Sequence, residues 1–460
     1  MIAVKKHAYL VAVIFALGLF VRVAVFYSYL QDDANYWQVD SLTYQSVAQG
    51  IAAGHGISTV TGVPNFYRVP GYSLYLSLFH KYVPLSNYCG GNADIAALWG
   101  QVFLGALIPV LIFFLSLTLF PGYMTLAAAA GLYSSVHVGL VLYSGFLMTE
   151  TLFLLFFLGF LLLFFAHKDN PKRLAIAGVL LGVASLIRPV GHYVIVLGLL
   201  ILMLQKTHFL VKLRNSVLMF LAWLIPVSVW LARNYLLLGH IFFHTLPGGH
   251  FLNLSASRVV MQAENITYQQ ARKKVTIQAN QLVRKQQRSE RKRLSDIERC
   301  YIYEKLAIKH FAAHPLITLK MWATDIFRTT FSLYSAEVLY LDSGRKIIDY
   351  FANGRTVWNM VERYLFPATD KLYLKILVWL EILLYALMLC GFARGTWYVL
   401  MRGTHNEKIL WVTIMSFMAL FLIISLAGGY ARMRLPIEPF IIILGLYGYV
   451  TQHKKVSEKR

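Results

Sequence analysis

The chain has 460 residues, of which 58% are hydrophobic and only 14% are charged, and its mean hydropathy is +0.58. This composition excludes an ordinary soluble domain and an intrinsically disordered chain, and it indicates a protein that crosses a membrane several times. The formal net charge is +22. Membrane lipids are expected partners and nucleic acid is not, and the sequence leaves the oligomeric state open.

Ten hydrophobic segments follow one another along the chain. Runs such as 151–166 and 174–187 carry no charged residue, as expected for helices that must satisfy every backbone polar group inside lipid. Some runs are shorter than the roughly 20 residues of an ideal span, so they need their flanks, a tilt or local thinning of the bilayer. We predict an all-α integral membrane protein with about ten transmembrane helices, near residues 8–30, 95–120, 123–144, 148–166, 174–189, 190–205, 215–238, 373–394, 408–428 and 434–451.

The lysine and arginine residues between these segments set the expected orientation. The positive-inside rule makes one side cytoplasmic, and the basic residues on that side are Lys5, Lys6, Lys172, Arg173, Lys206, Lys212, Arg214, Arg394, Arg402, Lys454, Lys455, Lys459 and Arg460. Both termini are then cytoplasmic, as an even number of spans requires. We expect the first segment to be an uncleaved span, because Arg22 interrupts its apolar run and no convincing small-residue cleavage site follows.

Two long loops, residues 31–94 and 239–372, fall on the opposite, outer side. Residues 258–309 contain 13 Lys and Arg against 5 Asp and Glu, a net charge of +8, and loops this long largely escape the positive-inside rule. Residues 295–298 form a capping box that opens a helix towards His314, and Pro315 can begin the next helix. These basic helices are expected at the membrane interface, either as a solvated face or in contact with anionic headgroups or phosphorylated glycolipids.

Neither the cysteines nor any cofactor-binding motif in the sequence indicates a bound metal or nucleotide. Cys89 and Cys300 both lie in outer loops, and the sequence leaves open whether they form a disulfide, whereas Cys390 lies within a span. No metal-binding Cys and His spacing, phosphate-binding glycine loop, nucleotide fingerprint or internal repeat stands out. An enzyme of this kind must draw its activated group from a donor that needs no nucleotide site.

Asp40, beyond the first hydrophobic segment, and Glu150, at the mouth of the fourth, fall on the same outer face. Two carboxylates on one wet side of a membrane indicate an active site, because a transporter more often places such groups near mid-membrane. The alternative is that each carboxylate only caps the start of a helix. Glu381 lies inside the eighth segment, and we expect it to pair with a neighbouring helix.

Several short motifs occur in a fixed order around these carboxylates. They are residues 39–50, 54–56 (Gly-His-Gly), 67–72 (Tyr-Arg-Val-Pro-Gly-Tyr), 148–151 (Met-Thr-Glu-Thr), 182–189, 230–235 with Gly239, and 432–439. In this order and on this topology, the set resembles the GT-C glycosyltransferases, and among them bacterial members of the protein mannosyltransferase and aminoarabinose transferase superfamily. The resemblance covers most of the chain and is strongest over residues 1–240.

This resemblance implies a GT-C fold and an inverting transferase that takes a sugar from a polyprenyl-phosphate carrier on the outer leaflet. Asp40 matches the catalytic base of the family, although Ser41 stands where some relatives have a second acidic residue. Glu150 matches an acidic residue that assists in the site, in some members through a divalent cation such as Mg²⁺ or Mn²⁺. Tyr44, His55 and Tyr67 are candidate contacts to the substrates, and the alternative for Tyr44 and His55 is that they are solvated loop residues.

The expected chemistry is consistent with these residues. A carboxylate can take the proton from the attacking hydroxyl or amine, while the leaving polyprenyl phosphate carries its charge on oxygen and needs cations around it. Candidates to bind this phosphate are the arginines predicted near outer ends of spans, namely Arg68, Arg188, Arg233, Arg432 and Arg434. Each of them can alternatively reach the interface or cap helix carbonyls.

We predict three regions in the chain. Residues 1–240 are expected to form the core transmembrane module, residues 241–372 an extracytoplasmic region with basic interfacial helices, and residues 373–460 the C-terminal transmembrane helices. The expected location is the bacterial inner membrane, with the site facing the periplasm and an extracytoplasmic glycolipid such as lipid A, a polysaccharide or a protein as acceptor. The alternative function is a transporter or flippase of lipid-linked sugars, which predicts mid-membrane charges and repeat symmetry.

Overall fold

The structure is a computed structural model that describes residues 7–30, 33–82, 91–166, 170–342, 358, 361–362, 365–367, 369–424 and 428–457. Helices joined by turns and loops make up these residues, and the described chain contains no β-strand beyond an isolated bridge between Ser58 and Pro64. The predicted all-α fold class is therefore confirmed.

Six helices within the described ranges are long and apolar enough to cross a membrane. They are α2 (Ala8–Val25), α6 (Asn92–Leu119), α12 (Phe209–Leu238), α21 (Leu372–Arg402), α22 (His405–Ile424) and α23 (Glu438–Ser457), the last preceded by the 3-10 helix η3 (Ala431–Ile437). A seventh crossing results if the bent pair α7 (Met124–Val136) and α8 (Val138–Gly145) forms one span. The chain is a multi-pass membrane protein, and the count of ten crossings stays a prediction.

The three remaining predicted spans are helical but short. They correspond to α9 (Glu150–Phe165), α10 (Pro171–Ile187) and α11 (Gly191–Leu204). α9 packs against both α6 and α10, and α10 packs along α12, where Trp223 Nε1 donates to Ser185 Oγ at 3.1 Å. Neighbouring helices cover much of the surface of α9 and α10. This packing stabilises the two helices in the bundle although they are shorter than an ideal span.

Arg22 of α2 stabilises the break between α7 and α8, which meet at an angle of 46°. The arginine is buried, and it donates to the carbonyl oxygens of Ser135 and Leu140, on either side of the break, at 3.3 and 3.2 Å. A broken helix leaves carbonyl groups that lipid cannot satisfy. The hydrogen bonds of Arg22 therefore have a structural role inside the bundle.

Glu381 of α21 is also paired inside the bundle, with the start of another helix. Its carboxylate accepts from the backbone N–H groups of Tyr334 and Ser335, both at 2.8 Å, where α18 (Ser335–Asp342) begins. The expectation that Glu381 pairs with a neighbouring helix is confirmed. The carboxylate suits this place because the first N–H groups of a helix have no partner within it.

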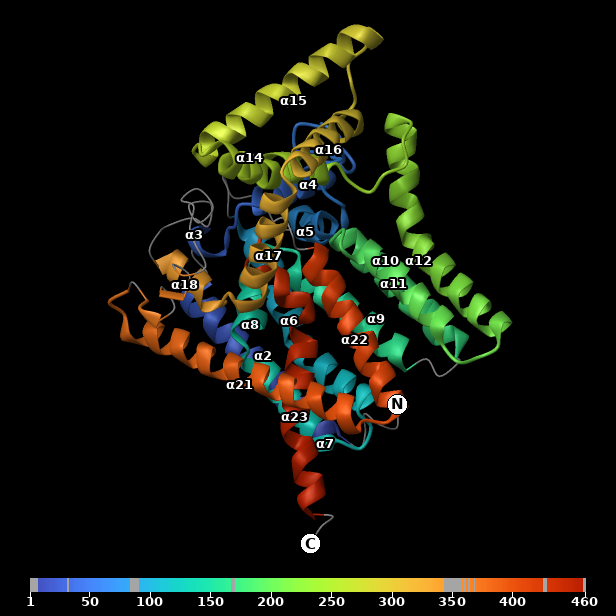
Figure 1. Cartoon of the computed structure of the whole chain (residues 1–460), viewed down its shortest axis with the longest axis vertical. Helices are drawn as coiled ribbons and strands as arrows, with labels where there is room; N and C mark the ends of the chain where they lie inside the picture. Colours follow the sequence, from blue (N-terminus) through green and yellow to red (C-terminus); the bar gives the residue numbers. More distant parts are fainter. Residues whose placement is uncertain are drawn as a thin grey trace.

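Residues 246–331 of the second long loop fold into helices at one end of the bundle (Figure 1). These are α13 (Leu246–His250), the π-helix η2 (Phe251–Ala256), α14 (Ser257–Glu264), α15 (Tyr268–Glu290), α16 (Asp296–Ala313) and α17 (Pro315–Phe331), here called the helical cap. The predicted capping box of Ser295 and Glu298 opens α16, and Pro315 begins α17. α15 buries a row of small and branched residues at every fourth position, so its basic side chains face outward.

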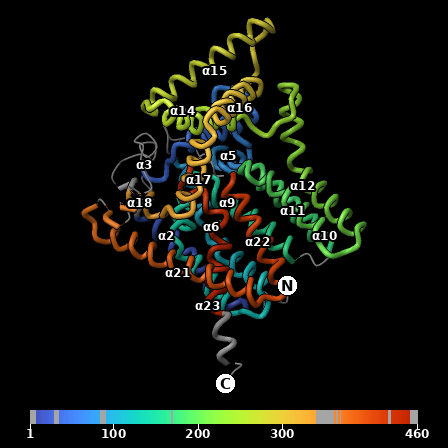
Figure 2. Tube along the Cα trace, in the orientation of Figure 1, coloured from blue at the N-terminus to red at the C-terminus, as the bar shows by residue number. Residues whose placement is uncertain are grey.

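The first long loop lies at the same end of the bundle as the helical cap (Figure 2). Its described residues contain α3 (Asp33–Tyr36), α4 (Ser41–Ala52) and α5 (Gly71–Tyr82), and the π-helix η1 (Phe26–Leu30) precedes them. Phe66, between α4 and α5, packs with Ile297 and Cys300 of α16. The two loops are therefore joined by a small apolar core. Cys89 lies outside the described residues, so its pairing with Cys300 stays open.

Candidate active site

Asp40 lies directly before α4, at the position of a helix cap, but it does not act as one. Within the described chain its side chain makes no capping hydrogen bond. The two carboxylate oxygens instead accept from Arg68 Nη2 at 2.5 Å and from Arg432 Nη1 at 2.8 Å. The side chain is 25% exposed, which leaves it open to a substrate.

Glu150 is the first residue of α9 and its side chain is fully buried. It accepts from Arg188 Nη1 at 2.6 Å and from Arg432 Nε. Arg188 directly follows α10, whose C-terminal end meets the start of α9. The guanidinium carbon of Arg188 also lies 5.8 Å from the ring centroid of Phe153. Two arginines thus compensate the charge of this buried carboxylate.

Arg432 joins the two carboxylates through separate nitrogens of one guanidinium group. It lies in η3, just after Gly429, whose φ of +59° places the chain against Asp325 of α17. The resulting cluster, here called the Arg432 cluster, contains Asp40, Glu150, Arg68, Arg188 and Arg432. Three guanidinium groups face two carboxylates, so the cluster has a surplus of positive charge.

The charges of the arginines determine the ionisation of Asp40. Burial by itself raises the pKa of the Asp40 carboxyl, but Arg432 and Arg68 outweigh burial and hold the pKa well below its ordinary value. His250 of α13 contributes in the same direction. Asp40 is therefore ionised at neutral pH, with both oxygens engaged by arginines.

Tyr44 and Tyr67, predicted as substrate contacts, lie against Arg68. The Tyr44 hydroxyl accepts from Arg68 Nη1 at 2.8 Å. The guanidinium carbon is 4.7 Å from the ring centroid of Tyr44 and 5.5 Å from that of Tyr67. Both rings lie within the distance at which a cation interacts with an aromatic face. They fix the plane of the guanidinium group beside Asp40.

Gly71 brings the first loop into close contact with the end of α10. A Cβ atom at this position would lie 2.6 Å from the carbonyl oxygen of Leu186, so a larger residue needs the two segments to separate. Arg68 lies three positions before Gly71, and Arg188 lies two positions after Leu186. This contact therefore helps to place both arginines at the same site.

Three predicted site residues in the described ranges, Arg233, Arg434 and His55, neither belong to the Arg432 cluster nor bind a side chain of it. Arg233 donates to carbonyl oxygens of the loop that precedes Arg68, at 2.7 and 3.0 Å. Arg434 is buried and donates to Glu438 at 2.5 Å and to three carbonyl oxygens at the end of α17. His55 is exposed in the loop that follows α4. These contacts give Arg233 and Arg434 structural partners, as the carbonyl-capping alternative describes.

The cluster does not fit a divalent cation held by Glu150 together with Asp40. In the described ranges, no three His, Cys, Asp or Glu side chains gather as metal ligands. The two carboxylates that do meet are bridged by Arg432, whose guanidinium group takes the position where a shared cation would bind both. A metal at this position has to displace a paired arginine.

Two groups near the cluster were not predicted. His250 follows Pro247-Gly248-Gly249, and only this glycine pair distinguishes it in the sequence. Glu337 of α18 accepts from the Tyr143 hydroxyl at 2.5 Å, and both side chains are buried. Glu337 is close enough to be influenced by the charges of Arg432 and Glu150. Neither Glu337 nor Tyr143 belongs to a recognisable motif, so only the fold brings them here.

Comparisons with known proteins identify the fold. No protein-family model and no curated protein matches the chain. Among solved structures, the oligosaccharyltransferase of Archaeoglobus fulgidus in the apo form matches with a TM-score of 0.51 and 11% identity, covering 98% of this chain and 51% of that one. The same organism's AglB in complex with an inhibitory peptide and a dolichol-phosphate matches with a TM-score of 0.54 and 12% identity, over 99% and 52% of the two chains.

A third structure, the oligosaccharyltransferase tethered to an acceptor peptide, gives a TM-score of 0.52 at 11% identity and covers 100% of this chain and 51% of that one. The chain thus spans about half the length of the solved structures that it matches. At this level of identity the comparison identifies the fold and leaves the activity to be argued from the site. The chain has the GT-C fold of membrane glycosyltransferases.

Proposed function

We propose that the chain is an inverting glycosyltransferase that moves a sugar from a polyprenyl-phosphate donor to an extracytoplasmic acceptor. The observation that carries this proposal is the Arg432 cluster, in which a partly exposed carboxylate and three guanidinium groups meet at one end of a GT-C fold. The matched AglB structure contains a dolichol-phosphate, which is a polyprenyl-type phosphate. This supports a lipid-linked donor.

In this mechanism Asp40 is the general base. The acceptor hydroxyl or amine attacks the anomeric carbon and gives its proton to the Asp40 carboxylate. The bond between that carbon and the phosphate oxygen breaks, the anomeric configuration inverts, and the electron pair leaves on the polyprenyl phosphate. Guanidinium groups stabilise the charge on the leaving phosphate, and Arg68 and Arg432 are the arginines next to the base.

The ion pairs of Asp40 imply an order of events. Both carboxylate oxygens accept from arginines, so the base has limited capacity to receive a proton. A donor phosphate that binds between Arg68 and Arg432 competes for the same N–H groups and releases a carboxylate oxygen. The donor therefore prepares the base, and the buried Glu150 keeps Arg432 anchored during the exchange.

We also propose the location and the division of the chain that the sequence predicts. The active site faces the periplasm from the bacterial inner membrane, residues 1–240 carry most of the site, and residues 373–460 complete it with Arg432. Helices α4 and α5 of the first long loop, which flank Asp40 and Arg68, lie at the same end of the bundle as the helical cap, and this supports the arrangement (Figure 1).

The test is direct cleavage of a donor. Protein purified in lipid nanodiscs is incubated with polyprenyl-phosphate sugars and envelope glycolipids, and free polyprenyl phosphate and the glycosylated product are measured by mass spectrometry. The proposal expects both products from the wild type and neither from Asp40→Asn. Movement of the intact lipid-linked sugar across a bilayer without cleavage would instead establish the transporter alternative.

A further inference from the structure

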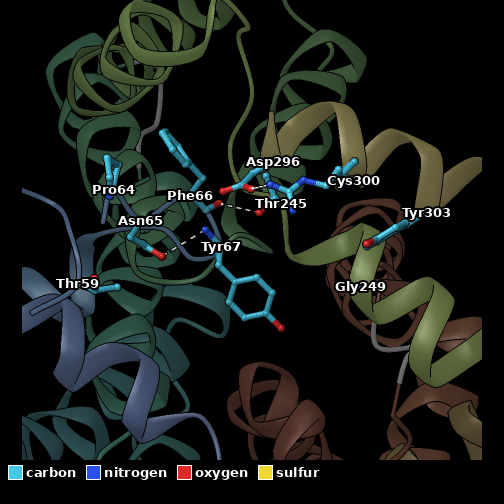
Figure 3. Close-up of a pocket in the computed structure, with 11 residues that line it drawn as sticks. Thr59, Pro64, Asn65, Phe66, Tyr67, Thr245, Gly249, Asp296, Cys300 and Tyr303 are labelled. Atoms are coloured by element: carbon cyan, nitrogen blue, oxygen red, sulfur yellow. Dashed lines mark hydrogen bonds and ion pairs between the residues drawn. The ribbon is translucent and has the colours of Figure 1, made fainter. Parts of the chain in front are cut away.

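A cavity of about 310 Å³ lies between the first long loop and the helical cap (Figure 3). Residues 64–67 form one wall, and Gly249 of α13 with Asp296, Arg299 and Tyr303 of α16 forms the other. The volume lies at the lower end of the range of about 300–1,000 Å³ that is usual for small-molecule sites. The cavity is therefore large enough for a compact polar group.

One wall of this cavity contacts an arginine that pairs with the base. Tyr67 lines the cavity, and its ring lies 5.5 Å from the guanidinium carbon of Arg68, which binds Asp40. On the opposite wall, Gly249 precedes His250, which lowers the pKa of Asp40 when its ring is protonated. Each wall thus contains a residue that contacts, or directly precedes in the chain, a group that acts on the Asp40 carboxylate.

The lining side chains have the character of a site for a neutral sugar ring. Tyr67 and Tyr303 project from opposite walls (Figure 3), and their hydroxyls have no hydrogen-bond partner among the described residues. Asp296 and Arg299 pair at 3.0 Å, so their charges cancel. Arg299 Nε is buried and also lacks a partner within the described chain.

Such groups match the two kinds of surface that a sugar presents. The C–H face of a pyranose packs on aromatic rings, while its hydroxyls bind carboxylate, guanidinium and phenol groups. A phosphate is a poorer match, because the lining offers one guanidinium group that is already paired with a carboxylate.

We propose that this cavity binds a neutral sugar residue of the acceptor and presents its hydroxyl to Asp40, so that the acceptor is a glycan or glycolipid. This inference rests on the proposed function, and it names the acceptor class. Asn65 supports the wall, since its amide donates to the Arg68 carbonyl at 2.8 Å and accepts from the Tyr67 N–H at 3.2 Å.

The first test measures binding of neutral methyl glycosides by saturation-transfer NMR on the protein in nanodiscs. We expect saturable signals with the wild type and with Tyr301→Ala, a matched control on α16 whose ring is exposed and outside the cavity lining. Tyr303→Ala should weaken the affinity about 10-fold, which corresponds to roughly 1.4 kcal/mol. Equal affinities in the two variants would overturn the inference.

A second variant pair fills the cavity without removing a contact. A Cβ atom added at Gly249 meets no atom within 4 Å, so Gly249→Leu projects into open space, and Gly249→Ala is the control. We expect Gly249→Leu to abolish glycoside binding and Gly249→Ala to retain it. Preference for sugar phosphates, or displacement of the glycoside by an acceptor peptide, would also contradict a neutral sugar site.

The two proposals fail in different ways. A wild-type protein that leaves every lipid-linked donor uncleaved refutes the glycosyltransferase proposal. If the wild-type protein cleaves the donor but binds no neutral glycoside, only the cavity assignment is refuted. The same holds if the wild type and Gly249→Leu bind the glycoside with equal affinity.

Discussion

Asp40 and Arg432 are 392 positions apart in the chain, yet the carboxylate accepts a hydrogen bond from the guanidinium group at 2.8 Å. The first long loop and η3, the 3-10 helix that precedes α23, thus share one ion pair. The same guanidinium group also binds Glu150, so one residue from the C-terminal region links both candidate catalytic carboxylates.

Arg432 should therefore be as important as either carboxylate. Arg432→Met removes a partner from both, leaving the buried Glu150 with Arg188 and Asp40 with Arg68. We expect transfer to fall at least about 10²-fold, with a coupling energy of roughly 1–3 kcal/mol to Glu150→Gln in a double-mutant cycle. Steady-state transfer rates provide the measurement, and the exposed Arg402→Met at the end of α21 is the control. Additive effects of the two substitutions would argue against the shared pairing.

Transfer should not require a divalent cation. Arg432 bridges the two carboxylates that a metal would otherwise share, and a guanidinium group provides positive charge to a phosphate without one. We expect the wild type to keep full transfer activity in excess chelator. The measurement is product formation with chelator, and then with added Mg²⁺ or Mn²⁺. Activity that disappears and returns with the metal would mean that a cation displaces Arg432 once the donor binds.

Arg68 should control how well the donor phosphate binds and the pH below which activity is lost. Arg68→Ala removes a charge-assisted contact to phosphate worth roughly 1.5–3 kcal/mol. Arg68→Lys should recover only part of this, because the planar group between Tyr44 and Tyr67 is lost. Losing the positive charge also raises the pKa of Asp40, which Arg432 and Arg68 hold low.

The sign of the pH effect follows from the base mechanism. Asp40 works ionised, so wild-type kcat/KM should show no acid limb above about pH 4, near the ordinary pKa of an aspartate. The limb of Arg68→Ala should lie at higher pH, so the activity of the variant relative to the wild type falls as the solution is acidified. Parallel pH profiles would indicate that Arg68 does not act on the base.

Most residues of the candidate site can be predicted from the sequence. The order of the motifs and the count of spans predict that these residues lie on one face of the membrane. Asp40, Glu150, Arg68, Arg188 and Arg432 all come together. Local sequence patterns carry no information on contacts between residues hundreds of positions apart. The bridge that Arg432 forms between Asp40 and Glu150 therefore cannot be predicted from them.

Arginine composition alone did not separate the candidates for phosphate binding. An arginine near a helix end serves a phosphate or a backbone carbonyl with the same N–H groups. The choice depends on which segment packs beside it. Arg233 meets the carbonyls of the first loop, and Arg434 meets those at the end of α17.

Hydropathy also located α9, α10 and α11, but the length of each alone does not decide whether it crosses the membrane.

The topology can be checked at Asn280, which is exposed on α15. The basic residues between spans predict that α15 faces outside and both termini face the cytoplasm. A periplasm-active reporter fused at Asn280 should be active, and the same reporter at the C-terminus should be inactive. Because α15 lies at the end of the bundle that holds the Arg432 cluster (Figure 1), a cytoplasmic signal at Asn280 would place the site on the cytoplasmic side.

The decisive variant is Asp40→Asn. Asparagine keeps the size of the side chain and can still accept from one arginine, but it cannot take a proton, so transfer should fall at least about 10²-fold. Asp40→Glu should keep a little activity, since the base survives but is displaced by a methylene group. Transfer rates are compared at equal donor occupancy, with thermal unfolding as a check on folding and the exposed Glu290→Gln on α15 as the control.

The two variants also separate catalysis from helix capping. Asp40 makes no capping bond in the described chain, so Asn and Glu should differ little in stability apart from the lost ion pairs with Arg68 and Arg432. A capping role predicts the opposite pattern, in which Asn is harmless and Glu disrupts folding. Near-normal transfer by Asp40→Asn would remove Asp40 as the base, and Glu150, already paired with Arg188 and Arg432, would become the carboxylate to test.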